Sequence, residues 1–162
     1  MDKLRIAIVP AGKWGSALAI PFLDNNHQVK LYKGSNFTTP DLEEVKGVDI
    51  LVISCNSEHV RSLFQKIRPN LSKKTIVVCV SKGIEEGTNL CMSQVLKDIE
   101  PNINSKLAVL SGPNFADEIS QRLPAMTIVA SENNNVAKFL QKAFTQARFF
   151  RPELFLMPNI CF

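Results

Sequence analysis

The feature that most restricts the fold is a regular alternation of short apolar runs with stretches of helical periodicity. Most of the apolar runs are nearly continuous, as expected for strands that are covered on both faces of a sheet. They are Leu4–Val9, Gln28–Lys33, Asp49–Ser54, Thr75–Val80, Lys106–Leu110 and Met126–Ala130. Strands that alternate with helices over short connections favour right-handed βαβ units. The pattern therefore predicts an α/β fold with a doubly wound parallel sheet, with Leu4–Val9 at its centre.

Between the apolar runs, hydrophobic residues recur at i, i+3, i+4 and i+7, which places them on one face of a helix. The three stripes are Val60, Leu63, Phe64 and Ile67, then Met92, Val95, Leu96 and Ile99, then Val136, Phe139, Leu140 and Ala143. We expect each stripe to pack on the sheet, and a further helix over Ser16–Leu23. No repeat, low-complexity tract or linker interrupts the pattern, so residues 1–150 are predicted to form one domain.

Composition and charge fit this fold and exclude several function classes. The chain has 162 residues, of which 45% are hydrophobic and 21% charged, which is typical of a globular domain with a buried core. Its net charge of +4 is scattered and includes no polybasic run, so we expect no nucleic-acid partner, although a phosphorylated small ligand is permitted. No apolar run approaches the ~18 residues of a membrane span, and the first residues lack the features of a signal peptide. A cytoplasmic protein without a membrane span is expected.

The cysteines and histidines show no metal-binding pattern. Cys55, Cys79, Cys91 and Cys161 form no CxxC pair, and both histidines stand apart from them. Zinc sites and disulfide frameworks usually show closely spaced ligand pairs, so neither is expected. We therefore predict no metal, and buried thiols in a reducing compartment.

The turn after the first strand has the form of a phosphate-binding loop. Dinucleotide folds place three glycines there, for a tight turn, for approach of the diphosphate, and for close packing of helix and strand. Gly12 and Gly15 occupy the second and third positions, whereas Pro10 stands in the first and removes an N–H group. The N-terminus of the following helix could still bind a diphosphate, and Lys13 would add a positive charge. An ordinary turn between strand and helix is the alternative.

The end of the second strand usually reports which dinucleotide is bound. An acid there binds the ribose 2′-hydroxyl of NAD, whereas a basic or hydroxyl-rich site accepts the 2′-phosphate of NADP. Here the segment reads Lys33-Gly34-Ser35, with no acid. NADP is therefore permitted as well as NAD, with Lys33 and Ser35 as candidate contacts. A solvated lysine in a polar turn is the alternative.

Two further loops follow strands whose carboxyl ends should lie at the ligand-binding edge of the sheet. One is Ser81–Gly87, in which Lys82 stands beside a glycine, and the other is Ser111–Glu118, which begins Ser-Gly-Pro-Asn. A lysine, backbone N–H groups and an amide could together hold a phosphate or polarise a carbonyl. Taken singly, each loop is more often plain turn chemistry.

Taken in order, these segments resemble the cofactor domain of bacterial-type NAD(P)-dependent glycerol-3-phosphate dehydrogenase. The matching stretches are AGKWGSALA (Ala11–Ala19), VSKGIE (Val80–Glu85), LSGPNFADEI (Leu110–Ile119) and RLPAMTIVAS (Arg122–Ser131). The resemblance covers nearly all of this chain but only about half of a full-length family enzyme. It implies a Rossmann-like cofactor domain and a hydride transfer between the nicotinamide and C2 of dihydroxyacetone phosphate or sn-glycerol 3-phosphate, whose product feeds phospholipid synthesis.

The resemblance also implies roles for individual residues. Those near the cofactor would be Lys13, Trp14 and Gly15 in the pyrophosphate turn, with Lys82 and Ala116 further along the chain. Together with Gly12 and Lys33, the candidate cofactor contacts are Gly12, Lys13, Trp14, Gly15, Lys33, Lys82 and Ala116. The implied substrate contacts are Lys82, Gly112 and Asn114.

The sequence departs from the family pattern in several places. Pro10 replaces a glycine, the segment after the second strand is short, and Ser54-Cys55-Asn56 stands where the family usually has a Val-Pro turn. The family continues beyond its sixth strand into a helical domain that supplies the catalytic lysine, whereas this chain reads Phe149–Leu154 at that point and soon ends. We therefore expect no catalytic residue in these 162 residues, and no activity from them alone.

Three hypotheses about function follow. The first is the cofactor domain of the dehydrogenase without its helical domain. The second is a non-catalytic dinucleotide-binding module that kept the loops. The third is a partner-binding remnant that no longer binds nucleotide, as Pro10 and the shortened loop would suggest.

The last twelve residues, 151–162, form an atypical tail with two prolines and no clear helix or strand pattern. Its large apolar residues are Leu154, Phe155, Leu156, Ile160 and Phe162. Such residues are expected to cover apolar surface, either by folding back onto the sheet edge or by forming a homodimer.

Overall fold

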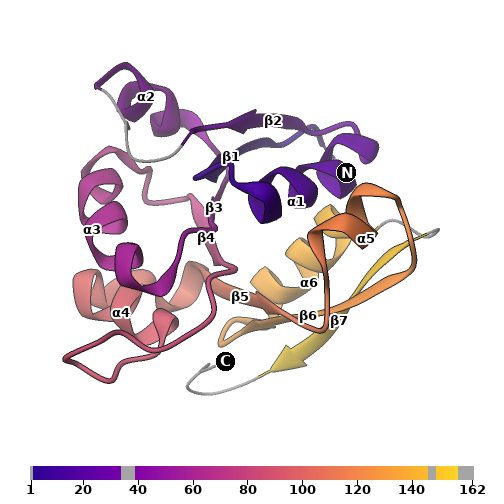
Figure 1. The fold of residues 1–162 in the computed structure, drawn as a ribbon. Helices are drawn as coiled ribbons and strands as arrows, with labels where there is room; N and C mark the ends of the chain where they lie inside the picture. The colour runs from indigo at the N-terminus through magenta and orange to yellow at the C-terminus, as the bar shows by residue number, and fades with distance from the viewer. Residues whose placement is uncertain (1, 34–38, 146–148, 157–162) are drawn as a thin grey trace.

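The structure, a computed structural model, describes residues 2–33, 39–145 and 149–156. Within these residues seven strands form one sheet in the order β2-β1-β3-β4-β5-β6-β7 (Figure 1). The strands are β1 Arg5–Val9, β2 Gln28–Leu31, β3 Ile50–Ile53, β4 Ile76–Cys79, β5 Leu107–Ser111, β6 Ala125–Ser131 and β7 Phe150–Leu156. The six strands expected from the apolar runs are therefore all present.

Helices cover the sheet on both faces, as a doubly wound fold requires. The helices are α1 Lys13–Asp24, α2 Thr39–Glu44, α3 Ser57–Ile67, α4 Met92–Ile99, α5 Ala116–Ser120 and α6 Asn134–Phe144, with short 3-10 turns at Val45–Gly47, Arg68–Asn70 and Pro101–Lys106. The predicted apolar stripes lie on α3, α4 and α6. No helix in the described part of the chain is long and apolar enough to cross a membrane.

The central strand β1 shows how the two layers share the sheet. Ile6 and Ile8 face the core formed with α1 and α6, whereas Ala7 and Val9 face the core formed with α3 and α4. All four side chains are buried. Because successive residues of a strand point to opposite faces, a continuous apolar run is what a strand between two helix layers needs.

Strand directions differ from the prediction at one position. Strands β2, β1, β3, β4 and β5 run parallel, but β6 runs antiparallel to β5, with Leu110 opposite Val129. The connection between β5 and β6 holds only the five-residue α5, which packs on α1. The chain therefore does not cross the sheet here and returns beside β5. The predicted doubly wound sheet is confirmed, but its parallel direction does not hold for β6; β7, which was not predicted as a strand, runs parallel to β6.

The first part of the tail is a strand, which was not predicted from the sequence. β7 pairs with β6 along its whole length, from Ala125 opposite Phe150 to Ser131 opposite Leu156. Phe150 is buried and Leu154 packs on the α1–α6 core, so this segment lies at the sheet edge, one of the two arrangements expected for the tail. It crosses the boundary expected after residue 150. Ile160 and Phe162 lie outside the described residues.

The cysteines only partly follow the expectation of buried thiols. Cys79 is a buried free thiol whose pKa is raised by burial to about 12, and Cys55 is a half-buried free thiol. Cys91 is disulfide-bonded, so the prediction was wrong there. Cys161 lies outside the described residues. Among the described residues, no group of three or more His, Cys, Asp and Glu side chains could hold a metal ion.

The first turn of α1 approaches the ends of β1 and β3 very closely at Gly15. A Cβ atom at this position would lie 2.7 Å from the carbonyl oxygen of Pro10 and 2.7 Å from Oγ of Ser54. That hydroxyl itself donates a hydrogen bond to the Pro10 carbonyl, at 2.7 Å. Only glycine therefore permits the observed spacing between α1 and the sheet.

We predict that Gly15→Ala destabilises the domain by about 1–2 kcal/mol, although alanine is the better helix former. The added methyl group meets a backbone carbonyl that cannot swing away, and this overpacking outweighs the gain of about 1 kcal/mol in helix propensity. Urea unfolding would measure the change. Ser16→Ala, at the exposed next position of α1, is the matched control and should leave stability within about 0.5 kcal/mol. Equal stability of both variants would contradict the close-packing argument.

Candidate functional site

The carboxyl ends of β1, β3, β4 and β5 meet at one edge of the sheet, as the parallel strand order requires. A cavity of about 310 Å³ lies at this edge. Its lining residues come from the starts of four different connections and are Trp14, Ser54, Cys55, Asn56, Val80, Ser81, Lys82 and Asn114. Three candidates singled out from the sequence, Trp14, Lys82 and Asn114, therefore converge on one cavity.

The turn after β1 leaves open space in front of α1. Gly12 is the N-cap of this helix, its φ of −75° suits any residue, and a Cβ added there would meet no atom of the described residues within 4 Å. Neither backbone conformation nor packing against the described residues therefore explains a glycine at this position. A glycine with open space beside helix N–H groups is suited to close approach of an anionic ligand.

Lys13 and Trp14 extend from the first turn of α1 in different ways. Lys13 Nζ forms an ion pair with Asp117 of α5 at 2.8 Å, with both side chains largely exposed. Trp14 is half-buried, packs against the α1–α6 core and forms part of the cavity wall. The lysine thus remains accessible to solvent, whereas the indole ring is held in place.

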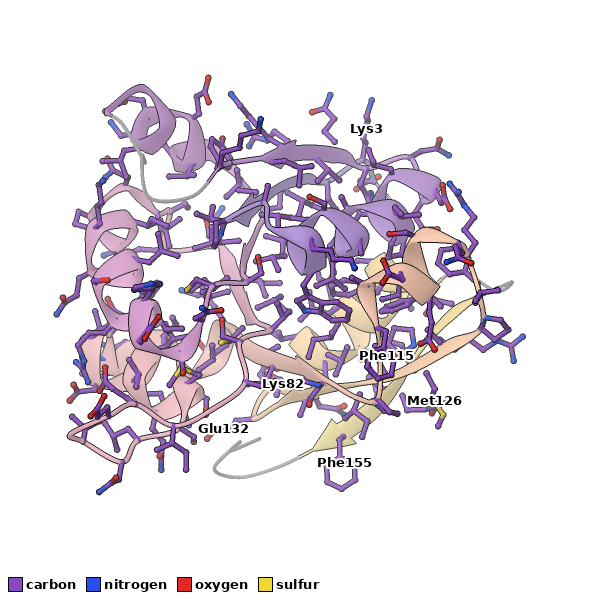
Figure 2. The ribbon with its side chains drawn as sticks, in the orientation of Figure 1. Lys3, Lys82, Phe115, Met126, Glu132 and Phe155 are labelled. Atoms are coloured by element: carbon purple, nitrogen blue, oxygen red, sulfur yellow. The ribbon has the colours of Figure 1, made fainter. Side chains whose placement is uncertain are left out.

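Lys82 reaches from the end of β4 toward the loop after β5 (Figure 2). Its ammonium group donates a hydrogen bond to the carbonyl oxygen of Gly112, at 2.9 Å. The side chain is exposed, so the ammonium group can exchange this contact for a ligand. The loops after β4 and β5 are thus joined by a direct contact.

Asn114 forms the cavity wall on the β5 side, and Gly112 lies directly behind its amide. Gly112 has a φ of +153°, and a Cβ there would lie only 2.8 Å from Nδ2 of Asn114. Both polar atoms of the Asn114 amide are buried and have no hydrogen-bond partner among the described residues. A buried amide without partners is costly unless a ligand or water satisfies it. Asn114 is therefore placed to bind a polar group in the cavity.

Six of the described sequence candidates are not among the lining residues: Gly12, Lys13, Gly15, Lys33, Gly112 and Ala116. Lys33 is exposed just beyond β2, whose end contacts the β1 turn through a hydrogen bond from Ala11 N to Tyr32 O at 2.6 Å. Ala116 begins α5 and packs on the α1–α6 core. Ser35 lies outside the described residues.

The β3 side of the cavity was not among the candidates predicted from the sequence. Ser54, Cys55 and Asn56 directly follow β3 and line the cavity together with Ser81. Their position in the sequence could have identified these residues, because they follow β3, which ends at the same edge of the sheet as β1 and β4. Burial raises the pKa of the Cys55 thiol, so this group faces the cavity in its neutral form at physiological pH.

An ion-pair network lies next to the Lys82 loop. The Glu85 carboxylate accepts two hydrogen bonds from Arg61 of α3, at 2.8 and 2.9 Å, and one from Thr88 Oγ1 at 2.6 Å. Arg61 also donates to Asp98 of α4 at 2.6 Å. Hydrogen bonding to Arg61, and then to Thr88, lowers the pKa of Glu85 to about 2. The carboxylate is therefore ionised throughout the physiological range.

Fold and site together define an α/β domain of the dinucleotide-binding type, with its cavity at the carboxyl edge of a doubly wound sheet. A family profile described as the N-terminus of NAD-dependent glycerol-3-phosphate dehydrogenase matches residues 36–137. The chain belongs to this family. The matched range includes both the Lys82 loop and the Gly112–Asn114 loop, whereas the β1 turn that contains Pro10 precedes it.

Similar proteins extend the match to almost the whole chain. A glycerol-3-phosphate dehydrogenase [NAD(P)+] of Syntrophotalea carbinolica is 34% identical over 91% of this chain and 52% of its own length. One of Corynebacterium urealyticum is 30% identical over 92% of this chain and 52% of its own length. The chain thus spans about half the length of the curated relatives that it matches.

Solved structures share the fold. The crystal structure of glycerol-3-phosphate dehydrogenase from Coxiella burnetii superposes with a TM-score of 0.78 at 23% identity, and the match covers 94% of this chain and 54% of that one. A pyrroline-5-carboxylate reductase from the same organism gives a TM-score of 0.70 at 12% identity, over 94% of this chain and 59% of that one. At these identities the likeness concerns the fold alone.

We predict an acid-dependent loss of stability that comes from Glu85. Because folding lowers the pKa of this carboxyl from 4.5 to about 2, its contribution is complete above pH 4.5 and is lost as the pH falls toward 2. Urea midpoints measured from pH 7 to pH 2 should therefore fall less steeply for Glu85→Gln than for the wild type. Glu86→Gln, at the exposed neighbouring position, should follow the wild-type curve. Parallel curves for Glu85→Gln and the wild type would contradict the assignment.

Proposed function

We propose that this chain is the cofactor-binding domain of an NAD(P)-dependent glycerol-3-phosphate dehydrogenase. The observation that carries the proposal is the convergence of Lys82 and Asn114 on one cavity beside the N-terminus of α1. These two residues come from the loops that lie within the family match. A non-catalytic dinucleotide-binding module is the alternative, and it would use the same cavity.

The α1 end of the site suits the diphosphate of a dinucleotide. Gly12 provides open space there, Lys13 provides a cation, and Gly15 holds the helix against the sheet. Trp14 and Ala116 would contact the cofactor from the cavity wall and from the start of α5. When bound, the nicotinamide exchanges a hydride with the substrate, and this chain orients the two partners.

The β4–β5 end of the site suits a phosphorylated three-carbon substrate. Lys82 provides a positive charge that can bind an oxyanion or polarise a carbonyl, because its partner among the described residues is the neutral carbonyl oxygen of Gly112. The Asn114 amide provides a donor and an acceptor that lack partners among the described residues. Gly112 keeps this amide in position, since any side chain there would displace it.

We predict that the chain binds NADPH at least as tightly as NADH, with dissociation constants in the micromolar range or weaker. The β2 end has Lys33 and no acid, so the 2′-phosphate is not repelled. The one tryptophan in the sequence, Trp14, lines the cavity, so its fluorescence reports binding directly. Lys82→Met should weaken binding, whereas Lys66→Met, at an exposed position on α3, should not.

Clearly tighter binding of NADH than of NADPH would show that Lys33 does not face the ribose. Absence of binding by either dinucleotide would reject the proposed function and favour a partner-binding role.

We also predict that the 162-residue chain reduces no measurable dihydroxyacetone phosphate. The resemblance assigns the proton-donating lysine to the helical half of the enzyme, which lies beyond the half that this chain spans. Loss of a general acid costs about 10²–10⁴-fold in rate. Oxidation of NADPH at saturating substrate measures turnover, with a full-length relative as the positive control. Robust turnover by the chain alone would show that its own residues complete the active site.

A further inference from the structure

Lys82 lies in the long loop that connects β4 to α4, and backbone contacts between Ile84–Glu85 and Leu90–Cys91 close the second half of this loop. Ile84 forms an isolated antiparallel bridge with Cys91. Glu85 N donates to Leu90 O at 2.8 Å, and Asn89 N donates to Glu85 O at 3.0 Å. Residues 84–91 therefore form a closed loop that begins two residues after Lys82, and Glu85 lies at its base.

The side chain of Glu85 ties the closed loop to the helices beneath it. Arg61 of α3 binds both carboxylate oxygens, and its remaining nitrogen binds Asp98 of α4. Arg61 is 27% exposed and Glu85 only 13%. Bidentate ion pairs that are partly shielded from water are stronger than exposed ion pairs such as Lys13–Asp117.

Between Lys82 and Glu85 the backbone also lies close to α3. Gly83 has a φ of +123°, and a Cβ there would lie 3.1 Å from Oγ of Ser57, the first residue of α3. Lys82 itself is exposed and, within the described part of the chain, has one side-chain hydrogen bond, to the Gly112 carbonyl. The position of its ammonium group therefore depends on the backbone of the loop, which the contacts of Gly83 and Glu85 with α3 keep in place.

We propose that Glu85 is a positioning residue for Lys82: by binding Arg61, it fixes the loop so that the lysine reaches the cavity. This inference rests on the proposed function for its binding readout, because Lys82 must contact the dinucleotide for affinity to report its position. It assigns a role to the last residue of the Val80–Glu85 stretch, which does not itself line the cavity.

A double-mutant cycle separates positioning from general stability. The four proteins are the wild type, Glu85→Gln, Lys82→Met and the double variant, and NADPH affinity is measured by Trp14 fluorescence. Glu85→Gln should weaken binding roughly fivefold when Lys82 is present and have no effect in the Lys82→Met background. Asp98→Asn is the matched control, because it neutralises an acidic partner of Arg61 that lies outside the loop, and it should bind within about twofold of the wild type.

A second measurement does not require a bound ligand. The rate at which acetic anhydride modifies Lys82, read by peptide mass spectrometry with Lys66 as the internal reference, should rise severalfold in Glu85→Gln because the ammonium leaves Gly112. Equal losses of affinity from Glu85→Gln in the wild-type and Lys82→Met backgrounds would overturn the proposal. If no form of the chain binds a dinucleotide, the proposed function fails, and the modification rate alone decides: an unchanged rate overturns the positioning role.

Discussion

The close contact between α1 and the end of β1 determines where every other part of the site can lie. At Gly15 the helix backbone approaches the Pro10 carbonyl and the Ser54 hydroxyl so closely that a methyl group would not fit. The hydrogen bond from Ser54 to Pro10 joins the ends of β3 and β1 at the same point. One junction thus fixes the helix N-terminus, the β1 turn and the β3 side of the cavity relative to one another. Pro10 lacks an N–H group, but its carbonyl oxygen is used in this junction.

Much of the fold could be predicted because local pattern and tertiary environment agree. The continuous apolar run of β1 is buried between two helix layers, and the stripe on α3 faces the sheet. The hydrophobic pattern of a strand does not reveal whether it runs parallel or antiparallel to its neighbour. The reversal at β6 depends on α5 being short and packing on α1, and no periodicity in the sequence reports that contact. β7 was missed because Pro152 argues against a strand, although proline is tolerated at a sheet edge.

The candidate site, like the fold, could be predicted from the sequence only in part. That Lys82 and Asn114 would be neighbours follows from two parallel strands, β4 and β5, ending at one edge, and a motif on each could be read from the sequence. The bond from Lys82 to the Gly112 carbonyl, and the burial of the Asn114 amide without a described partner, depend on distances between loops that no spacing rule gives. Equally, the glycine pattern groups Gly12 with Gly15, whereas only the structure separates a position open to a ligand from one closed by packing.

The polar contacts around the cavity differ in strength in a way that suits binding. Lys13 and Lys82 have exposed side chains, and the partner of each among the described residues is Asp117 or the Gly112 carbonyl, respectively. Such contacts contribute little to stability and exchange readily for an anionic ligand. The Glu85–Arg61 ion pair is bidentate and partly buried, so it should persist when a ligand binds. Binding would then replace weak contacts within the chain while the loop that presents Lys82 stays in place, which limits the ordering that association must offset.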